Sequence, residues 1–235
     1  MASFNYDYRR QILLKSDLFR CLQPKDVDAI LAFARERRFA NGQTIFQKGD
    51  PGSSLMAVLR GRVRIGTVSE EGKEISLTIV ETGQIFGEVA LLDGQQRSAD
   101  AVALGECQLL IIERRDFIPY IEKNPQVPIA MMGVLCGRLR STNTLVEDIA
   151  FLDLPARMAR LLLRLGDSYG RKTQRGVRID VKLTQKDLGN LIASSRESIN
   201  KQLRSWQDEE LIAVEQGYIT LLKPDRIADQ GKGAG

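Results

Sequence analysis

The stretch Ile85–Ala99, IFGEVALLDGQQRSA, is the most informative part of the chain. Gly87 allows a close backbone approach to a ligand, because glycine has no Cβ. Val89–Leu92 can form one short helical turn whose free amides point at an anion. Arg97 offers a fork of N–H donors that suits two phosphate oxygens, and Ser98 adds a hydroxyl. This stretch therefore gathers donors suited to an anion.

Glu88 lies inside the same stretch and cannot bind a phosphate. Its carboxylate can accept a hydrogen bond from a hydroxyl group such as the 2′-hydroxyl of a ribose. One arginine, one carboxylate and free amides together indicate a sugar phosphate with a single negative charge. The alternative interpretation is a simple surface ion pair between Arg97 and Glu88.

Glycines are concentrated around this stretch, and ten of the chain's 20 fall within residues 42–105. Short apolar runs separate them, such as Leu55–Leu59, Val63–Ile65 and Ile75–Val80. Short strands joined by turns have this pattern, which predicts an antiparallel barrel or jelly roll rather than a parallel sheet. A helix is predicted before the strands, at Lys25–Arg37.

A long helix is predicted after Pro128, because apolar residues then recur at alternating spacings of three and four. We expect these residues to form a dimer interface: Met132, Leu135, Leu139, Val146 and Ile149. Thr142 interrupts the stripe and Asn143 follows it. A polar residue in such an apolar stripe lowers the stability of a coiled coil and often has another role. The alternative is an ordinary helix packed on its own core.

The C-terminal third shows the signature of a winged helix-turn-helix. Thr184–Asp187 forms a capping box before one helix, and Ser195 can cap a second helix that runs through Trp206. A hairpin with a tight turn follows at residues 211–222. The residues expected to contact DNA are Gln185, Lys186, Ser195, Arg196, Glu197, Asn200, Lys201 and Arg204. Such side chains can reach base edges in a major groove, although a charged helix face is also commonly just solvated.

The charge distribution agrees with an acidic partner for this third alone. The net charge is +4 overall, and from Leu154 onward 15 Lys and Arg against 10 Asp and Glu give +5. The preceding residues carry 19 against 20, which gives −1. Basicity confined to one region favours an acidic partner for that region and not for the rest of the chain.

Composition excludes several other classes of protein. The chain has no histidine, so Ser-His-Asp triads and histidine-bound zinc or haem are excluded. Its three cysteines, Cys21, Cys107 and Cys136, are far apart and are expected to be small buried apolar residues. No apolar run is long enough to span a bilayer, and no secretory signal is recognised, which favours the cytoplasm.

Two stretches then carry a resemblance to a known family. FGEVALLDGQQRSA looks like the phosphate-binding cassette of cyclic-nucleotide-binding domains. LTQKDLGNLIASSRESINKQLRSWQDEELI resembles the helix-turn-helix of the cyclic AMP receptor protein family of bacterial transcription regulators, and AFLDLPARMARLLLRL resembles its hinge. The resemblance covers roughly Leu18–Leu222.

The resemblance implies an α+β fold: an N-terminal jelly-roll-like β-roll, a long dimerisation helix and a C-terminal winged helix-turn-helix. The expected domains are residues 1–125, the β-roll with its N-terminal helix; 126–153, the dimerisation helix and hinge; 154–230, the DNA-binding domain; and 231–235, a disordered tail.

The resemblance also assigns nucleotide-binding roles. The matching positions are Leu77, Thr78, Gly87, Glu88, Val89, Arg97, Ser98, Thr142 and Asn143. Glu88 and Arg97 would hold the ribose and the cyclic phosphate. Thr142 and Asn143 would contact the base, with Asn143 reaching from the other subunit.

The function implied is that of a cyclic-nucleotide-responsive transcription regulator rather than an enzyme. Its effector would be cAMP, with cGMP as a second possibility, and no cofactor or metal is expected. The expected partners are double-stranded palindromic DNA, a second copy of the chain and RNA polymerase, without a membrane. The alternative is a nucleotide-binding regulatory subunit that controls a protein partner.

Three departures from the family pattern have physical consequences. Asn143 stands where serine is common, and its amide can serve adenine or guanine by rotating. Ala193 occupies a turn position that often holds glycine, so its backbone should be either strained or differently shaped. Lys201 replaces an arginine of the reading set, which should weaken guanine discrimination because an ammonium is not a planar fork.

Overall fold

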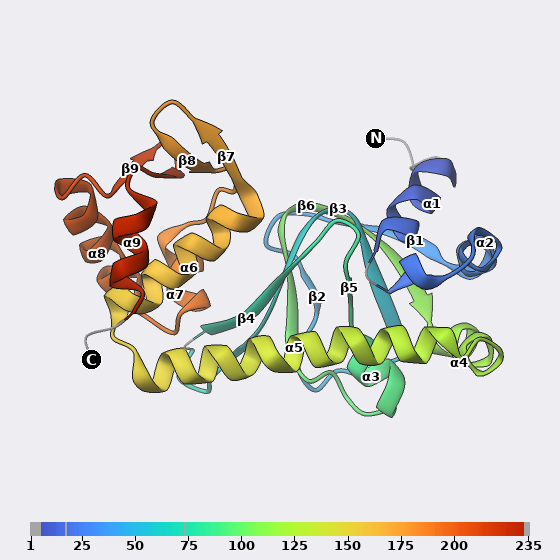
Figure 1. The fold of residues 1–235 in the computed structure, drawn as a ribbon. Coiled ribbons are helices and arrows are strands. Elements are labelled where there is room, and N and C mark those ends of the chain that lie inside the picture. Colours follow the sequence, from blue (N-terminus) through green and yellow to red (C-terminus); the bar gives the residue numbers. More distant parts are fainter. Residues whose placement is uncertain (1–5, 17, 73, 233–235) are drawn as a thin grey trace. The chain divides into compact units, whose positions relative to one another are not determined.

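The computed structural model describes residues 6–16, 18–72 and 74–232, shown in Figure 1. The chain forms two compact units, one made of Met1–Gly72 and Leu77–Ser141, the other of Lys73–Ser76 and Thr142–Gly235. Among the described residues, no helix combines the length and the apolar character needed to cross a membrane.

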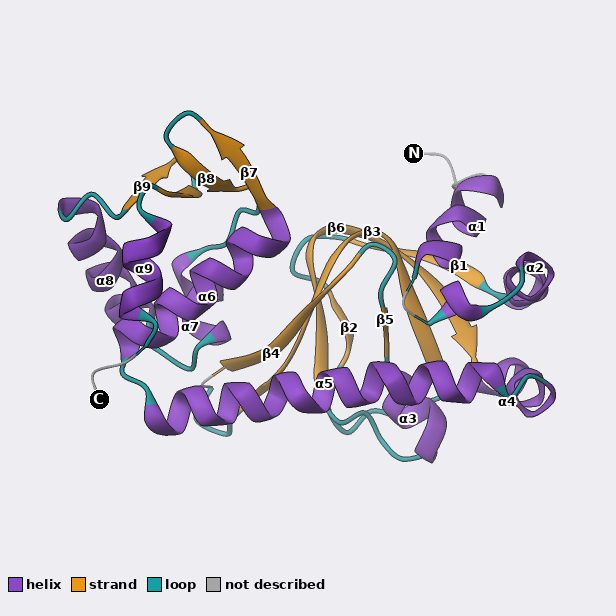
Figure 2. Cartoon of the chain, viewed as in Figure 1, coloured by secondary structure: helices purple, strands orange, loops and turns teal. Residues whose placement is uncertain are grey.

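The N-terminal region contains helices on an antiparallel sheet (Figure 2). In chain order its elements are α1 (Tyr6–Lys15), η1 (Phe19–Cys21), α2 (Pro24–Phe33), β1 (Arg35–Phe39), β2 (Thr44–Phe46), β3 (Ser54–Val68), β4 (Glu74–Glu81), β5 (Ile85–Phe86), α3 (Glu88–Asp93), β6 (Asp100–Glu113), α4 (Arg114–Lys123) and α5 (Gln126–Phe151). The strand order is β1-β6-β3-β4, with β2 paired to β6 and β5 to β3. The predicted antiparallel β-roll and long helix are confirmed.

Strand β3 explains why both faces of this sheet are covered. Successive side chains alternate between faces of a strand, and Leu55 and Leu59 join a core that also includes residues of α1, α2, α4 and α5. Met56 and Val58 join a second core, which contains Phe86. Both sets are buried, so short apolar runs suffice to place the strand.

The helix predicted at Lys25–Arg37 is too long at its C-terminal end. It ends at Phe33, and Ala34 has an extended backbone. Arg35–Phe39 pairs instead with β6 as strand β1. Pairing between strands distant in sequence here outweighs local helix propensity, which is a weak predictor.

The second unit contains α6 (Leu154–Tyr169), β7 (Gly170–Thr173), β8 (Gly176–Ile179), α7 (Gln185–Leu191), α8 (Arg196–Asp208), β9 (Ile212–Glu215), β10 (Tyr218–Leu221) and α9 (Pro224–Gln230). Its strands form a four-stranded sheet in the order β7-β8-β10-β9. Two glycines and four basic residues predict a loop for Tyr169–Arg178, but this prediction is wrong, because β7 and β8 pair there as a hairpin. All residues of β7 are exposed, so the apolar alternation that marks most strands is missing there.

The helix-turn-helix follows the predicted local chemistry. The Thr184 and Asp187 side chains form the capping box of α7, and the Ser195 side chain accepts a hydrogen bond from the Ser198 amide at the start of α8. Between the helices, Ala193 has a φ of +52°, so of the two expected alternatives the structure shows the strained backbone.

Two further expectations need correction. Gly231 is buried and its carbonyl oxygen accepts a hydrogen bond from Arg160 Nε at 2.9 Å, so a disordered tail does not begin there; residues 233–235 lie outside the described residues. Cys107 is buried as expected, but Cys136 is exposed, because the face of α5 that carries it is not covered within this chain. The side chain of Cys21 is outside the described part.

Candidate functional site

The stretch after β5 forms the expected turn and short helix. Gly87 has a φ of +78° and caps α3, and Gly94 closes the helix with a φ of +71°. A Cβ on Gly87 would lie 2.7 Å from Arg97 Nη1 and 3.1 Å from the Ser54 carbonyl oxygen. Glycine is therefore required at position 87 both for its backbone conformation and for the space that Arg97 uses.

Arg97 is buried in the roll, with 5% of its surface exposed. Its Nη1 donates to the carbonyl oxygens of Ser54, at 2.8 Å, and Gly87, at 2.9 Å. Its Nη2 donates to Ser54 Oγ at 3.0 Å. The guanidinium also lies over the Phe46 ring, 4.3 Å from the centroid. Backbone and side-chain contacts thus fix the guanidinium before any ligand binds.

Burial lowers the pKa of Arg97, and the nearby carboxylates of Asp50, Glu88 and Glu113 oppose this shift. An arginine starts from so high a pKa that it stays protonated in proteins. The Nε of Arg97 is buried without a hydrogen-bond partner among the described residues. The site therefore holds a fixed positive charge with an unused donor.

Glu88 is also buried, with 1% of its surface exposed. Its Oε1 accepts a hydrogen bond from Arg138 Nη1 on α5, and Arg138 Nη2 donates to the Ile85 carbonyl oxygen. Figure 1 shows α3 beside α5 at this contact. Glu88 Oε2 is buried and has no partner among the described residues.

The surface pair between Arg97 and Glu88, which was the alternative interpretation, is therefore wrong: Glu88 pairs with Arg138. The sequence reasoning missed Arg138. A cation next to the apolar stripe of α5 was the available signal, but on that helix the sequence analysis considered only the apolar stripe and the polar residues Thr142 and Asn143.

The other predicted nucleotide contacts are more exposed. Leu77 is 39% and Val89 37% exposed, and Ser98 is exposed next to the buried Arg97. Thr78 is half-buried on β4. Thr142 and Asn143 are exposed on the part of α5 that belongs to the second unit.

The predicted recognition helix α8 has one buried and one polar face. Ile199, Leu203 and Trp206 are buried beneath it. The side chains expected to contact DNA lie on the other face; Ser195, Arg196, Glu197, Lys201 and Arg204 are exposed and Asn200 is half-buried. At the start of α7, Lys186 is exposed and Gln185 half-buried.

Helix α5 leaves an apolar stripe exposed. Met132 is 55%, Leu139 63%, Val146 60% and Ile149 39% exposed, and Leu135 is half-buried. Large apolar side chains in a regular row on a surface mark an interaction site. Within the described chain this stripe faces solvent.

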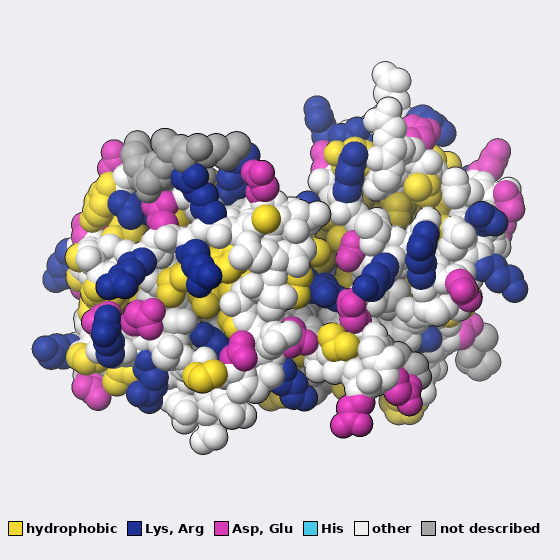
Figure 3. All heavy atoms as spheres, turned by 180° about the vertical axis from the view of Figure 1, so that it is seen from behind, with side chains coloured by type: hydrophobic (Ala, Val, Ile, Leu, Met, Phe, Trp, Pro, Cys, Tyr) yellow, Lys and Arg dark blue, Asp and Glu magenta, His cyan; other side chains and the backbone are white. Residues whose placement is uncertain are grey.

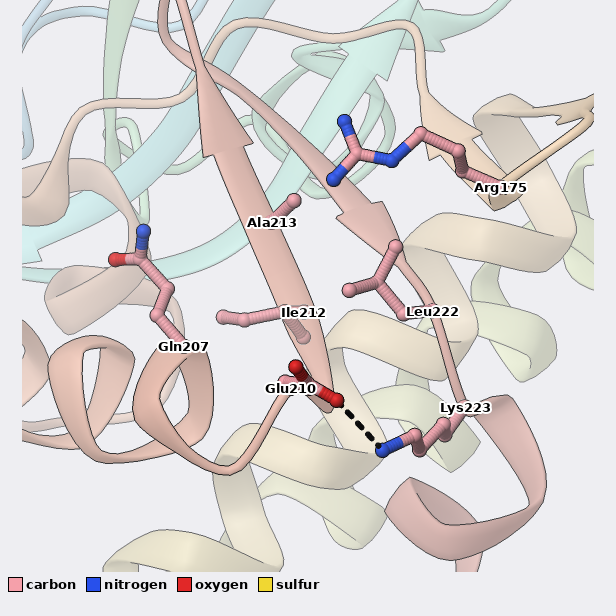
Figure 4. Close-up of a pocket in the computed structure, with 7 residues that line it drawn as sticks. All are labelled: Arg175, Gln207, Glu210, Ile212, Ala213, Leu222 and Lys223. Atoms are coloured by element: carbon pink, nitrogen blue, oxygen red, sulfur yellow. Dashed lines mark ion pairs between the residues drawn. The ribbon is translucent and has the colours of Figure 1, made fainter.

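A separate cavity of about 330 Å³ lies in the second unit (Figure 4). It is lined by Arg175, Gln207, Glu210, Ile212, Ala213, Leu222 and Lys223. Its charged groups are already paired: Glu210 contacts Lys223 at 3.6 Å, and Arg175 contacts Glu215 at 2.6 Å. The cavity therefore offers no unsatisfied charge to a ligand.

Charged side chains of both signs are interspersed on the face shown in Figure 3, without a continuous basic field. Among the described residues, no group of three or more Cys, Asp or Glu side chains is placed to hold a metal ion. The buried cassette around Arg97 is thus the strongest ligand site, and the polar face of α8 is the strongest macromolecular one.

Comparisons with known proteins match the two regions of the chain that contain the cassette and the helix-turn-helix. A cyclic nucleotide-binding domain model matches residues 36–124, and a Crp-like helix-turn-helix model matches residues 156–229. The CRP-like cAMP-activated global transcriptional regulator of Mycobacterium tuberculosis is 29% identical over 222 residues, covering 94% of this chain and 99% of the relative. The cyclic AMP receptor protein of Thermus thermophilus is 30% identical, with 87% of this chain and 91% of the relative covered.

A solved structure of the c-di-GMP-responsive global regulator CLP of Xanthomonas campestris has a similar fold. Its TM-score is 0.77 at 22% identity, over 86% of this chain and 100% of that chain. A nucleotide cassette joined to a DNA-binding helix-turn-helix defines a class of transcription regulators rather than enzymes. Within that class, the chain belongs to the cyclic AMP receptor protein family.

Proposed function

We propose that this chain is a homodimeric regulator whose binding to palindromic operator DNA is promoted by a cyclic purine nucleotide, with cAMP as the first candidate and cGMP as the second. The observation that carries the proposal is a pair of buried atoms that have no hydrogen-bond partner in the described part of the chain, the donor Arg97 Nε and the acceptor Glu88 Oε2. A buried polar atom without a hydrogen bond costs about 1–3 kcal/mol.

A cyclic nucleotide satisfies both atoms at once. An oxygen of its phosphodiester accepts from Arg97 Nε, and its ribose 2′-hydroxyl donates to Glu88 Oε2. The phosphodiester carries one negative charge, which matches the single fixed guanidinium of Arg97. An anion without a hydroxyl group would satisfy only one of the two.

In this proposal, Thr142 and Asn143 contact the base of the nucleotide and determine which base is preferred. An asparagine amide presents both a donor and an acceptor, so it suits the edge of either purine. One relative is named as cAMP-activated and one structural neighbour is described as c-di-GMP-responsive. Direct titration must therefore decide among the three nucleotides.

The exposed stripe of α5 supports a second copy of the chain as partner. A helix of 26 residues is about 39 Å long, and its apolar row follows the seam spacing of a coiled coil. The polar face of α8 supports double-stranded DNA as the other partner. RNA polymerase and a cytoplasmic location belong to the same proposal, since such a regulator acts where transcription occurs.

Helix α5 is the proposed route from nucleotide to DNA. It carries Arg138, which pairs with Glu88, and further along it carries Thr142 and Asn143. A nucleotide that contacts these positions stabilises one arrangement of α5 in the dimer. The two α8 helices of the dimer, which are the proposed recognition helices, would then lie about 34 Å apart. This distance is one turn of DNA.

The proposal is tested by calorimetric titration of cAMP, cGMP and c-di-GMP, followed by DNA binding with and without the tightest ligand. We expect wild-type protein to bind a cyclic purine nucleotide and to bind palindromic DNA more tightly in its presence. Glu88→Gln and Arg97→Lys should lose that enhancement, while Arg115→Lys, at a side chain that is 74% exposed, should keep it.

Equal DNA affinity with and without each nucleotide would contradict the proposal. Nucleotide binding without any salt-dependent DNA binding would indicate the regulatory-subunit alternative instead. Thermal unfolding of each variant separates a lost contact from a lost fold, because Arg97 and Glu88 are both buried.

A further inference from the structure

The contacts of Arg97 determine which of its N–H groups can meet a ligand. An arginine has five N–H donors: one on Nε and two on each Nη. Nη1 uses both of its donors, on the carbonyl oxygens of Ser54 and Gly87. Nη2 uses one, on Ser54 Oγ. With respect to the residues that the structure describes, the donors that remain are the Nε–H and one N–H of Nη2.

Ser54 explains which Nη2 donor remains. Its carbonyl oxygen and its hydroxyl contact Nη1 and Nη2 respectively, so this single residue spans the end of the planar guanidinium. The remaining Nη2 hydrogen therefore points to the same side as the Nε–H. These two parallel donors form an edge that matches two oxygens of a phosphate.

We infer that Ser54 is a positioning residue for nucleotide binding: it occupies the end of the Arg97 guanidinium and leaves the Nε–Nη2 edge to receive the cyclic phosphate. The inference rests on the proposed function and deepens it. Ser54 itself touches no ligand atom in this arrangement. It is the first residue of β3 and is 7% exposed, so the long strand holds it rigidly.

Phe46 restricts movement of the Arg97 guanidinium perpendicular to its own plane. Its ring lies under the guanidinium plane and also packs against Phe86, with 5.8 Å between the ring centroids. An aromatic face attracts a cation, so Phe46 fixes the plane of the Arg97 guanidinium. The two hydrogen bonds to Ser54 fix how the guanidinium is rotated within that plane. Together they pre-organise the site, which reduces the entropy lost when a nucleotide binds.

The first test follows the Nε–H of Arg97 by ¹H–¹⁵N NMR of the full chain. The Arg97 signal is assigned by its absence in Arg97→Lys. We expect a solvent-protected signal that moves downfield on saturation with cAMP or cGMP, whichever binds. An unchanged signal in a saturated protein would show that another edge receives the phosphate and would overturn the inference.

The second test is a double-mutant cycle on nucleotide affinity. Ser54→Ala should raise the dissociation constant about tenfold, since it removes one hydrogen bond to a charged group. In an Arg97→Lys background it should change the constant by less than about twofold, because an ammonium has no edge to orient. Ser53→Ala is the matched control, at an exposed neighbouring serine, and should bind normally.

A merely structural role for Ser54 would lower the melting temperature and weaken binding equally in both backgrounds, which would contradict the inference. Wild-type affinity in Ser54→Ala would also overturn it while leaving the proposed function intact. If wild-type protein bound neither cAMP nor cGMP, the proposed function and this inference would fail together.

Discussion

Arg138 and Glu88 form an ion pair that joins α5 to the first residue of α3. The Glu88 side chain is 2% exposed and that of Arg138 is 31% exposed, so the pair is largely shielded from water. Arg138 also holds the end of β5 through the Ile85 carbonyl oxygen. One guanidinium therefore connects the strand, the short helix and the long helix around the candidate nucleotide site.

Removing Arg138 alone should be costly, because it leaves a carboxylate buried without its partner. We expect Arg138→Met to lower the free energy of unfolding by about 3 kcal/mol. The double variant Glu88→Gln/Arg138→Met should recover most of that loss, since position 88 then carries no unpaired charge. Urea unfolding measures both, with Arg115→Met as an exposed control. A loss below about 1 kcal/mol for Arg138→Met would contradict the shielding of the pair.

Arg160 makes a comparable connection in the second unit. Its Nη1 contacts Asp148 Oδ1 at 2.6 Å, and its Nε donates to the Gly231 carbonyl oxygen at 2.9 Å. The Asp148 side chain is 9% and the Arg160 side chain 45% exposed. This arginine therefore joins the end of α5 to α6 and to the end of α9.

We expect Arg160→Met to lower the free energy of unfolding of the second unit by about 2 kcal/mol, because Asp148 loses its partner in a nearly buried position. Arg164→Met, one turn later on the exposed side of α6, should change it by less than about 0.5 kcal/mol. The fluorescence of Trp206, the chain's single tryptophan, reports unfolding of this unit. Equal effects of the two variants would show that the Asp148 contact contributes little.

Ala193 offers a stabilising change in the DNA-binding unit. Its φ of +52° places it in the left-handed region, which costs an L-residue about 1–2 kcal/mol. Ala193→Gly should therefore raise the free energy of unfolding by about 1 kcal/mol. Ala156→Gly, inside α6, should lower it by a similar amount or more, since glycine is unfavourable within helices. A lower stability in both variants would contradict the strain assigned to Ala193.

Two helical glycines should respond oppositely to alanine. A Cβ on Gly189 would lie 2.5 Å from the Ser194 carbonyl oxygen, whereas a Cβ on Gly133 would meet nothing within 4 Å. Gly189→Ala should cost about 1–3 kcal/mol and weaken DNA binding, because the turn between α7 and α8 must shift. Gly133→Ala should stabilise α5 by up to about 1 kcal/mol. Thermal unfolding of the two variants provides the comparison.

Features set by local chemistry were predictable from the sequence. The capping box at Thr184, the cap at Ser195 and the strain at Ala193 depend on residues within one turn of the chain, and the structure confirms each of them. The short helix after Gly87 has the same local origin. The exposed row on α5 follows from the helical period, since its positions are fixed once the helix forms.

Features that join distant residues were not predictable. Ser54 and Arg97 are 43 positions apart, and Glu88 and Arg138 are 50 apart. No spacing rule connects such pairs, because the sheet register and the packing of α5 bring them together. The hairpin of β7 and β8 was missed for a related reason: its strands are held by pairing and not by an apolar pattern.

The final prediction concerns base readout by α8. Arg196 and Lys201 lie on its exposed polar face. Arg196→Ala should relax sequence preference at one base pair of the operator. Lys186→Ala should weaken binding to all operator variants alike, because a contact to phosphate carries no sequence information. Lys201→Arg should sharpen guanine preference by about 1 kcal/mol, since a planar fork can contact O6 and N7 together.

Binding to a set of single-base operator variants at fixed salt measures these three effects. A uniform loss across all variants for Arg196→Ala would show that Arg196 contacts the backbone and that the reading face of α8 is assigned wrongly. Because the salt dependence of binding counts phosphate contacts, Lys186→Ala should also reduce the slope of log affinity against log salt by about one, and Arg196→Ala should leave it unchanged.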